Sequence, residues 1–345
     1  MDTAREIRKG EALDWQKLES YLCSELPDFA TGEMSVSQFH GGHANLTYLL
    51  KFGEMELVLR RPPFGKIAPG AHDMKREYRV LSKLYKSFPQ APRAYLFCDD
   101  DSIIGSPFVV VERKQGVVVR YELLDYFKGF DKAEERLTTA MIKATAQLHK
   151  VDIEKAGLTK LGRPKGFLER QLNGWAKRWE LVNTEENKVM DEVFATLSAT
   201  MPTTQAVSII HNDIKLDNCQ FQPDNPDTVT AVFDWDMATL GDPLVDIGST
   251  LSYWYEPFFD QYDLPVSLSN TFPEKAFLIE KYAEFTGFSM EHIDWYYAFS
   301  CWKGAVVGQQ LYTRYVNGQS KDERMNKFGT FAEASSLFAQ KILQK

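Results

Sequence analysis

The sequence predicts an α+β protein of two lobes, with a small antiparallel sheet in the first lobe and mainly helices in the larger second lobe. A chain of 345 residues is long for one hydrophobic core and fits two lobes. Segments with strand character gather in the first third of the chain, whereas helical spacing of apolar residues dominates the remainder. A polar stretch at residues 211–218, followed by an apolar strand that ends in Asp234, marks the second lobe as the place of any chemistry.

The first lobe begins with a helix and two strands. Residues 12–26 place apolar side chains at near-helical spacing and predict an amphipathic helix, which Pro27 and Gly32 end. Residues 35–40 and 46–52 then predict two strands, so the segment between them is expected to be a hairpin loop.

A glycine-rich loop, Gly41-Gly42-His43-Ala44-Asn45, joins these two strands. Glycine has no Cβ, so Gly41 and Gly42 would allow backbone N–H groups to approach a phosphate, with Asn45 at the end of the loop. A Gly-Gly pair by itself more often makes only a turn. His43 is expected to be a solvated loop residue rather than a ligand.

A third strand and a second helix follow. Residues 56–60 alternate so that Val58 and Arg60 lie on one face of the strand, opposite the leucines between and before them. Residues 74–85 predict a helix from their apolar spacing, and this helix carries Glu77. A solvated surface position is the alternative for both Arg60 and Glu77.

The last strand of the first lobe covers residues 107–112, which are apolar up to Glu112. The polar break at residues 113–116 follows it. We therefore place the lobe boundary here, so that residues 1–115 form the N-lobe and residues 116–345 form the C-lobe.

The C-lobe is predicted to be largely helical. Residues 134–151 and 185–197 predict helices, and residues 163–179 mix basic and aromatic side chains in an amphipathic pattern. His149 is expected to be packed or capping rather than catalytic. The aromatic-rich remainder, up to residue 345, is expected to wall an acceptor site.

The polar stretch at residues 211–218 supplies the groups that phosphoryl transfer requires. It contains Asp213 and Asn218, and Asp234 follows the apolar strand at residues 230–233. A transferring phosphate is rich in negative charge, so its transfer depends on positioning and on neutralisation by Mg²⁺. An Asp can orient an acceptor hydroxyl and take its proton, and Asn and Asp oxygens suit Mg²⁺. Asp and Asn also dominate ordinary turns, so only the whole set is informative.

Three further polar residues near this stretch have structural interpretations. His211 is expected to brace the loop backbone. Asp242, before Pro243, reads as the N-cap of a helix. Asp246 has two possible interpretations, a carboxylate that braces the loop or a surface residue.

The order H-x-D-x-x-x-x-N, and then an Asp at the end of a strand, is typical of the catalytic and metal loops of the kinase fold. In that fold Val58 would face the adenine and Arg60 the phosphates, with Glu77 as the ion-pair partner of Arg60. Glu112 would lie at the hinge that contacts the adenine, and Lys215 could reach the γ-phosphate. Arg60 stands where most kinases have lysine, and its planar fork is not equivalent to an ammonium.

Composition excludes several other classes of protein. The chain has 40 basic against 48 acidic residues, a net charge of −8, which argues against a nucleic-acid-binding protein. Its four cysteines show neither zinc-site nor disulfide spacing, which favours a reducing cytoplasm. We expect no membrane span and no secretion signal, because neither a long apolar run nor an apolar stretch near the N-terminus is present.

Taken together, these motifs resemble the aminoglycoside phosphotransferase/choline kinase family, which has a protein-kinase-like fold. Within it, the chain is most similar to the phosphotransferase domain that is found alone in many bacteria and fused to some acyl-CoA dehydrogenases. Supporting stretches include 59–63, 76–81 and 105–108. The chain departs from the family pattern at Asn212, where relatives usually have glycine, and in the loop with His43 and Ala44.

The resemblance implies a kinase that uses ATP and Mg²⁺ on a hydroxyl of a small molecule. Asp213 would be the catalytic base, Asn218 and Asp234 the Mg²⁺ ligands, and Arg60 and Glu77 the pair that positions the nucleotide. Asp236 would assist the metal or the acceptor. A hydroxyacyl-CoA ester is the acceptor that the fused relatives suggest, with choline or an aminoglycoside as the alternative. The replacement of lysine by Arg60 also keeps open a nucleotide-binding pseudokinase that regulates a partner.

Overall fold

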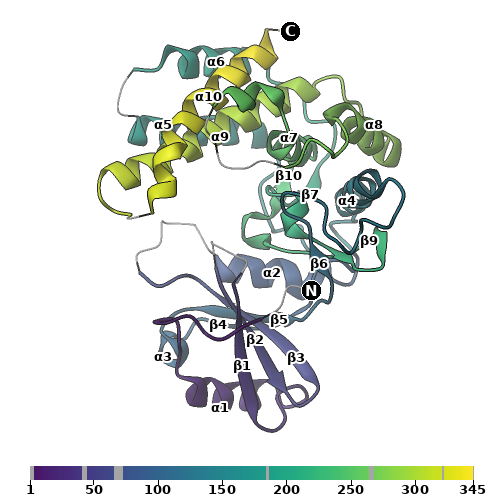
Figure 1. Ribbon diagram of the computed structural model, residues 1–345, viewed down its shortest axis with the longest axis vertical. Helices are drawn as coiled ribbons and strands as arrows, with labels where there is room; N and C mark the ends of the chain where they lie inside the picture. Colours follow the sequence, from purple (N-terminus) through teal and green to yellow (C-terminus); the bar gives the residue numbers. More distant parts are fainter. Residues whose placement is uncertain are drawn as a thin grey trace.

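The computed structural model describes residues 4–40, 45–65, 73–183, 186–262, 264, 268–320 and 322–344. Its first lobe contains an antiparallel sheet of five strands in the order β1-β2-β3-β5-β4 (Figure 1). These strands are β1 (Met34–Phe39), β2 (Leu46–Phe52), β3 (Met55–Arg61), β4 (Ala94–Cys98) and β5 (Phe108–Glu112). Four of them were predicted from the sequence, and β4 is an addition.

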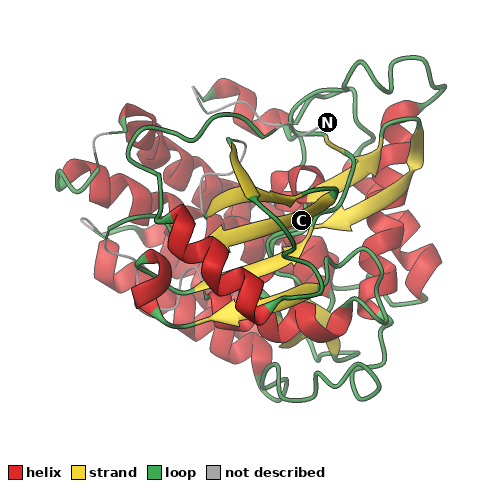
Figure 2. Cartoon of the chain, turned by 90° about the horizontal axis from the view of Figure 1, so that it is seen from below, coloured by secondary structure: helices red, strands yellow, loops and turns green. Residues whose placement is uncertain are grey.

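The two faces of this sheet pack into separate hydrophobic clusters. Val58 belongs to the cluster that includes α2 (Met74–Leu84) and continues into the second lobe. Leu57 and Leu59 belong to a second cluster, which α1 (Trp15–Glu25) covers. Figure 1 shows α2 on the side of the sheet that faces the second lobe and α1 on the far side, and in Figure 2 a helix crosses the near face of the strands. The predicted alternation in β3 is confirmed.

The N-terminal segment lies along the outer edge of β1. Arg5 and Gln38 exchange two backbone hydrogen bonds of 2.8 Å. The fully buried Gln38 side chain accepts a hydrogen bond from the backbone N–H of Arg8 at 2.8 Å and donates one to the Glu11 carboxylate. The Tyr48 hydroxyl on β2 donates to the Glu11 carbonyl at 2.6 Å. These bonds fasten the segment before α1 to the sheet.

The second lobe combines short strands with longer helices. The strands form a three-stranded sheet, β6-β8-β9, and a separate pair, β7-β10. Their bounds are β6 (Val117–Val118), β7 (Ser208–Ile210), β8 (Cys219–Gln222), β9 (Asn225–Val232) and β10 (Thr239–Gly241). The helices are α4 (Ala133–His149), α5 (Phe167–Val182), α6 (Lys188–Ala199), α7 (Leu244–Tyr253), α8 (Lys275–Thr286), α9 (Ile293–Val316) and α10 (Lys327–Leu343), and α3 (Asp101–Ile104) is a short helix of the first lobe.

Helix α9 is the centre of the second lobe, since α5, α7 and α10 all pack against it (Figure 1). Its contact with α7 depends on Gly248, because a Cβ there would lie only 2.4 Å from the carbonyl oxygen of Tyr296. The small antiparallel sheet and the larger helical region confirm the predicted fold class. No helix in the described part of the chain is both long and apolar enough to cross a membrane.

Candidate active site

A cleft of about 390 Å³ contains most of the residues that the sequence pattern singled out. Side chains from the first lobe and from residues 213–235 line it together. The predicted residues among them are Asn45, Val58, Arg60, Glu77, Glu112, Asp213, Lys215, Asn218 and Asp234. Gly41 and Gly42 lie outside the described residues, so a phosphate-binding role for them stays a prediction.

Arg60 joins two carboxylates across the cleft. One guanidinium nitrogen pairs with Glu77 on α2, and another binds Asp234 Oδ1 at 2.9 Å. The Glu77 side chain is fully buried, and this burial, only partly offset by Arg60, raises the pKa of Glu77 to about 7. The ion pair with Glu77 was predicted, whereas the bond to Asp234 was not.

Both carboxylate oxygens of Asp213 accept hydrogen bonds. Oδ1 accepts one from the Tyr253 hydroxyl at 2.6 Å, and Oδ2 accepts one from the Asn218 amide at 2.8 Å. The Lys215 ammonium lies 3.4 Å from Oδ2 and 4.8 Å from the centre of the Tyr253 ring. An acceptor hydroxyl that approaches Asp213 must therefore share or replace one of these contacts.

Hydrogen bonds of His211 and Asp246 hold the backbone around Asp213 in place. The His211 ring nitrogen Nε2 donates to the carbonyl of Phe233 at 2.8 Å, and its Nδ1 accepts the N–H of Asp213 at 3.3 Å. The Asp246 carboxylate accepts the backbone N–H groups of His211 at 2.7 Å and Asn212 at 2.6 Å. The bracing role predicted for His211 is confirmed, and Asp246 proves to be a brace as well.

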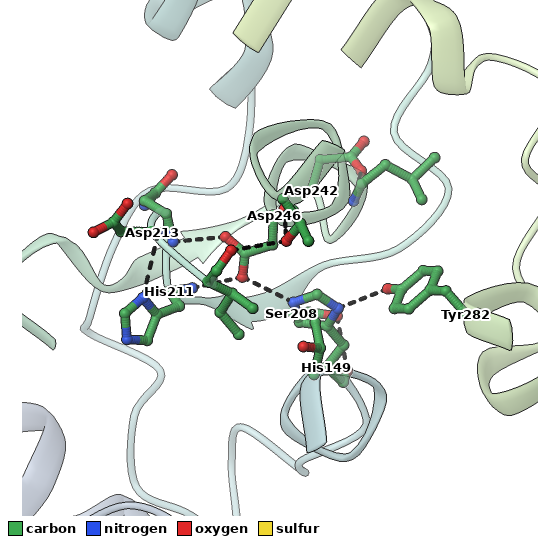
Figure 3. Close-up of polar contacts among 12 residues, drawn as sticks. His149, Ser208, His211, Asp213, Asp242, Asp246 and Tyr282 are labelled. Carbon is green, nitrogen blue, oxygen red and sulfur yellow. Dashed lines mark hydrogen bonds and ion pairs between the residues drawn. The ribbon is translucent and has the colours of Figure 1, made fainter. Parts of the chain in front are cut away.

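This brace extends into the core of the second lobe (Figure 3). His149 on α4 places Nε2 3.0 Å from Asp246 Oδ2 and Nδ1 2.6 Å from the Tyr282 hydroxyl on α8. Burial opposes ionisation of Asp246, but the hydrogen bond and the charge of His149, together with His211, lower its pKa. His149 is packed, as predicted, and it stabilises the catalytic loop through Asp246.

Asp242 acts as the helix cap that the sequence predicted, with a shift in boundary. Its carboxylate accepts the N–H of Leu244 at 3.0 Å and the hydroxyl of Tyr296 at 2.8 Å. Pro243 already has helical backbone angles, although α7 begins at Leu244. Such boundaries commonly differ by one residue.

Asp234 and Asn218 present hard oxygen donors to the cleft. Asp234 has a left-handed backbone conformation with φ of 71°. Burial alone would raise the pKa of Asp234, but the charge and hydrogen bond of Arg60 outweigh this effect and lower the pKa. Asn218 uses its amide nitrogen on the carbonyl and the carboxylate of Asp213, which leaves its amide oxygen available for another ligand. One carboxylate and one amide oxygen fit the ligand chemistry of Mg²⁺, which phosphate oxygens and water usually complete. No cluster of three or more His, Cys, Asp or Glu side chains suited to a metal occurs in the described chain.

Glu112 and Lys215 take positions that modify their predicted roles. Glu112 donates its backbone N–H to Arg93 O at 2.8 Å, and its carboxylate binds the Arg93 N–H and the Lys114 ammonium at 3.0 Å each. A contact between Glu112 and an adenine therefore stays a prediction. The Lys215 ammonium also lies 3.8 Å from Asp217, so the carboxylates of Asp213 and Asp217 hold it in place.

Three residues of this region were missed or underrated in the sequence. Asp217 was not among the predicted site residues, but it lines the cleft, and burial raises its pKa. Tyr253 and Lys303 belong to the segment expected to wall the acceptor site but were assigned no individual role. Tyr253 binds Asp213, and Lys303 lies in the electrostatic field of Asp213. Both come from helices far along the chain, and no local spacing signals such a contact.

Comparisons with known proteins agree with this geometry. Residues 35–278 match the family model APH, described as the phosphotransferase enzyme family. Acyl-CoA dehydrogenase family member 10 of Mus musculus is 29% identical over 349 residues, covering 97% of this chain and 32% of that protein. The chain thus spans about a third of the length of this relative.

Solved structures show the same fold. A provisionally named aminoglycoside phosphotransferase from Ralstonia eutropha has a TM-score of 0.81 at 28% identity, covering 96% of this chain and 99% of that chain. Choline kinase from Cryptosporidium parvum has a TM-score of 0.64 at 12% identity, and the match covers 96% of this chain and 96% of that chain. Spectinomycin phosphotransferase with ADP and spectinomycin bound has a TM-score of 0.60 at 11% identity, and the match covers 97% of this chain and 100% of that chain. The match of the family model over most of the chain shows that the protein belongs to the phosphotransferase enzyme family, as its sequence motifs implied.

Proposed function

We propose that this phosphotransferase transfers the γ-phosphoryl group of ATP to a hydroxyl of a small molecule in a Mg²⁺-dependent reaction. The observation that carries the proposal is the convergence of Asp213, Asn218, Asp234 and Arg60 on one cleft. Such a set does little to stabilise the fold, because carboxylates that are gathered in a partly buried place repel one another. Groups of this kind are therefore typical of functional sites. Structures of this fold with bound nucleotide, such as the ADP complex of spectinomycin phosphotransferase, support ATP as the donor.

Each of the converging side chains has a defined part in this reaction. Asp213 orients the acceptor hydroxyl and accepts its proton, and the Asn218 amide keeps its carboxylate in place. Arg60, anchored by Glu77, directs its positive charge toward the phosphates. Asn218 and Asp234 would hold Mg²⁺, which neutralises charge on the phosphates when bound.

The arrangement of the chain supports a lobe boundary between residues 115 and 116. The first sheet ends at Glu112, and the next strand, which begins at Val117, pairs with β8 of the second lobe. In this proposal residues 1–115 carry the nucleotide-binding sheet and residues 116–345 carry the catalytic loops and the acceptor site. The protein would act in the cytoplasm, a proposal that rests on its scattered cysteines.

The acceptor class is the open part of this proposal. The relatives named as acyl-CoA dehydrogenase family members favour a hydroxyacyl-CoA ester, whereas the solved neighbours include a choline kinase and aminoglycoside phosphotransferases. Arg170, one of the basic side chains in residues 163–179, donates hydrogen bonds to the carbonyl oxygens of Lys165 and Arg163, so its guanidinium is already engaged within the chain.

The decisive experiment measures ADP release with Mg-ATP in the wild type and in Asp213→Asn. Without the carboxylate, kcat should fall by at least about a hundredfold, because proton acceptance contributes on that scale. Affinity for Mg-ATP in calorimetry should stay nearly unchanged. Asp224→Asn, the same change at an exposed position, should retain full activity.

A near-normal kcat in Asp213→Asn would refute the role of Asp213 as base. Asp234→Ala should lose Mg²⁺-dependent nucleotide binding, and unchanged binding would remove Asp234 from the metal site. Tight Mg-ATP binding without turnover of any acceptor would favour the pseudokinase alternative, which the bond between Arg60 and Asp234 keeps in view.

A further inference from the structure

Lys303 lies half-buried in the middle of α9, and no carboxylate among the described residues pairs with it. Its ammonium lies 5.4 Å from the centre of the Trp175 ring on α5. It makes no ion pair and no hydrogen bond with any residue that the structure describes. Lys275, which is similarly half-buried, instead binds the Glu256 carboxylate at 2.9 Å and a carbonyl oxygen at 2.6 Å. A buried ammonium normally has such partners, since desolvation is costly.

Arg178 places a second cation on the same indole ring. Its guanidinium lies 4.2 Å from the centre of the Trp175 ring, and it too has no ion pair with a described residue. The ring attracts each cation, but the two like charges repel one another. Burial and the charge of Arg178 both lower the pKa of Lys303. An anion that binds near the two cations would offset this repulsion.

Lys303 lies within the electrostatic field of Asp213, and α5, which carries Trp175 and Arg178, packs against α9. The charges of Asp213 and Asp246 act on Lys303, whereas Lys303 does not line the cleft described above. Helix α9 also packs against α7, which carries Tyr253, the residue whose hydroxyl binds Asp213. A group held by Lys303 would therefore belong to a molecule that approaches Asp213 from outside the nucleotide site.

We propose that Lys303, Arg178 and Trp175 form a subsite for an anionic group of the acceptor, a carboxylate or a phosphate, while the acceptor hydroxyl reaches Asp213. This inference rests on the proposed kinase function. The cations attract the anionic group, and the indole ring fixes their positions.

The subsite also discriminates against other acceptors. Choline and aminoglycosides are cationic, and like charges placed together in a partly buried site are disfavoured. The chain thus selects an anionic hydroxyl compound through the same two side chains that would repel a cationic one.

The test compares hydroxyl compounds of different charge. Hydroxybutyrate, its uncharged methyl ester, hydroxybutyryl-CoA and choline are assayed by ADP release in the wild type, Lys303→Met and Lys303→Arg. Lys177→Met, at an exposed position on α5, is the matched control. We expect Lys303→Met to raise KM for the anionic acceptors by about tenfold or more, as removal of one partner of a charge pair does. The KM values for the methyl ester and for Mg-ATP should not change, and Lys303→Arg should restore most of the affinity.

The acceptors also separate the two sources of negative charge. An effect on both hydroxybutyrate and its CoA ester assigns the subsite to the acyl end, and an effect on the CoA ester alone assigns it to the phosphates. An equal loss with charged and uncharged acceptors would overturn the proposal, because Lys303 would then act only through Asp213. A wild-type preference for choline would overturn it as well.

Calorimetry separates this proposal from the kinase function itself. If no acceptor is turned over, the binding of hydroxybutyrate and of CoA is measured in the wild type and in Lys303→Met. Weaker binding in the variant would support the subsite while the kinase function fails. Equal binding, or none in either protein, would overturn the subsite, and the affinity for Mg-ATP would then test the kinase function separately.

Discussion

Asn212 adopts a backbone conformation that most residues avoid. Its φ of 70° is left-handed, and glycine or asparagine fills such a position with the least strain. Its amide nitrogen also donates to the carbonyl of Met237 at 2.9 Å, which links the catalytic loop to the segment after Asp234. Asn212 therefore fits the left-handed conformation that the glycine expected from the resemblance would adopt, and its side chain adds a hydrogen bond to Met237.

Substitutions at Asn212 should separate the backbone effect from the side-chain effect. Asn212→Gly and Asn212→Ala both lose the bond to Met237, but only alanine brings a Cβ without compensation into the left-handed region. We expect the alanine variant to be less stable than the glycine variant by about 1–2 kcal/mol, the usual cost of that conformation. Urea unfolding of the two variants measures this difference, and equal stabilities would contradict it.

Tyr253 donates its hydroxyl to Oδ1 of Asp213, the carboxylate that is the base in the proposed mechanism. Tyr253→Phe removes the hydroxyl but keeps the ring that contacts Lys215, so Oδ1 becomes open to water. ADP release from Mg-ATP without acceptor should rise several-fold, since Asp213 can then activate water. The double variant with Asp213→Asn serves as the blank. A Tyr253→Phe protein that hydrolyses ATP no faster than the wild type would show that the hydroxyl does not exclude water.

At the scale of elements, α7 connects the core of the second lobe to the site. It carries Asp246, which binds two backbone N–H groups of the catalytic loop, and it ends at Tyr253. Its depth in the lobe depends on Gly248, which lies against the backbone of Tyr296 on α9. A displacement of α7 would therefore move Asp246 and Tyr253 together.

Gly248→Ala should disturb this contact. The added Cβ would meet backbone atoms that cannot rotate away, and such overpacking usually costs about 1–3 kcal/mol. Both the free energy of unfolding and kcat should fall. Gly304→Ala on α9 is the control, because its Cβ would meet only the Phe331 ring at an ordinary 3.8 Å. That variant should be as stable as the wild type or more stable, since alanine favours helix; equal losses at both positions would refute the close-approach argument.

The sequence predicted what local patterns determine. Val58 and Arg60 share a face because strands alternate, and Asp213 and Asn218 meet because their spacing brings both into one loop. Tyr253 binds Asp213, and Lys303 enters its electrostatic field, only through the packing of α7 and α9, which no local spacing reveals. Short strands such as β6, with two residues, carry too little periodicity to be detected.

At the scale of the whole molecule, Arg60 links the two lobes. It lies on β3 of the first lobe, is only 13% exposed, and binds both Glu77 on α2 and Asp234 in the second lobe. Its planar fork serves two carboxylates at once, which gives a physical reason for arginine where most kinases have lysine.

Removal of the guanidinium should therefore weaken the whole fold. Arg60→Met leaves Glu77 fully buried without a cation, and such a loss typically costs about 3–5 kcal/mol. Arg60→Lys should be intermediate, because it keeps a charge near Glu77 but lacks the fork. Arg76→Met, which breaks only an exposed pair with Asp73, should cost less than about 1 kcal/mol. Urea unfolding of the three variants gives the ranking, and an Arg60→Met protein as stable as Arg76→Met would contradict it.

The N-terminal segment along β1 has a consequence for how the protein behaves in concentrated solution. A sheet edge with free backbone groups is a template for strands of other molecules, and this segment fills part of that edge through Arg5 and Gln38. A variant that begins at residue 12 would lack Arg8 and Glu11, the hydrogen-bond partners of the Gln38 side chain. The outer edge of β1 would then be exposed. Such a protein should self-associate and precipitate while its catalytic residues stay intact.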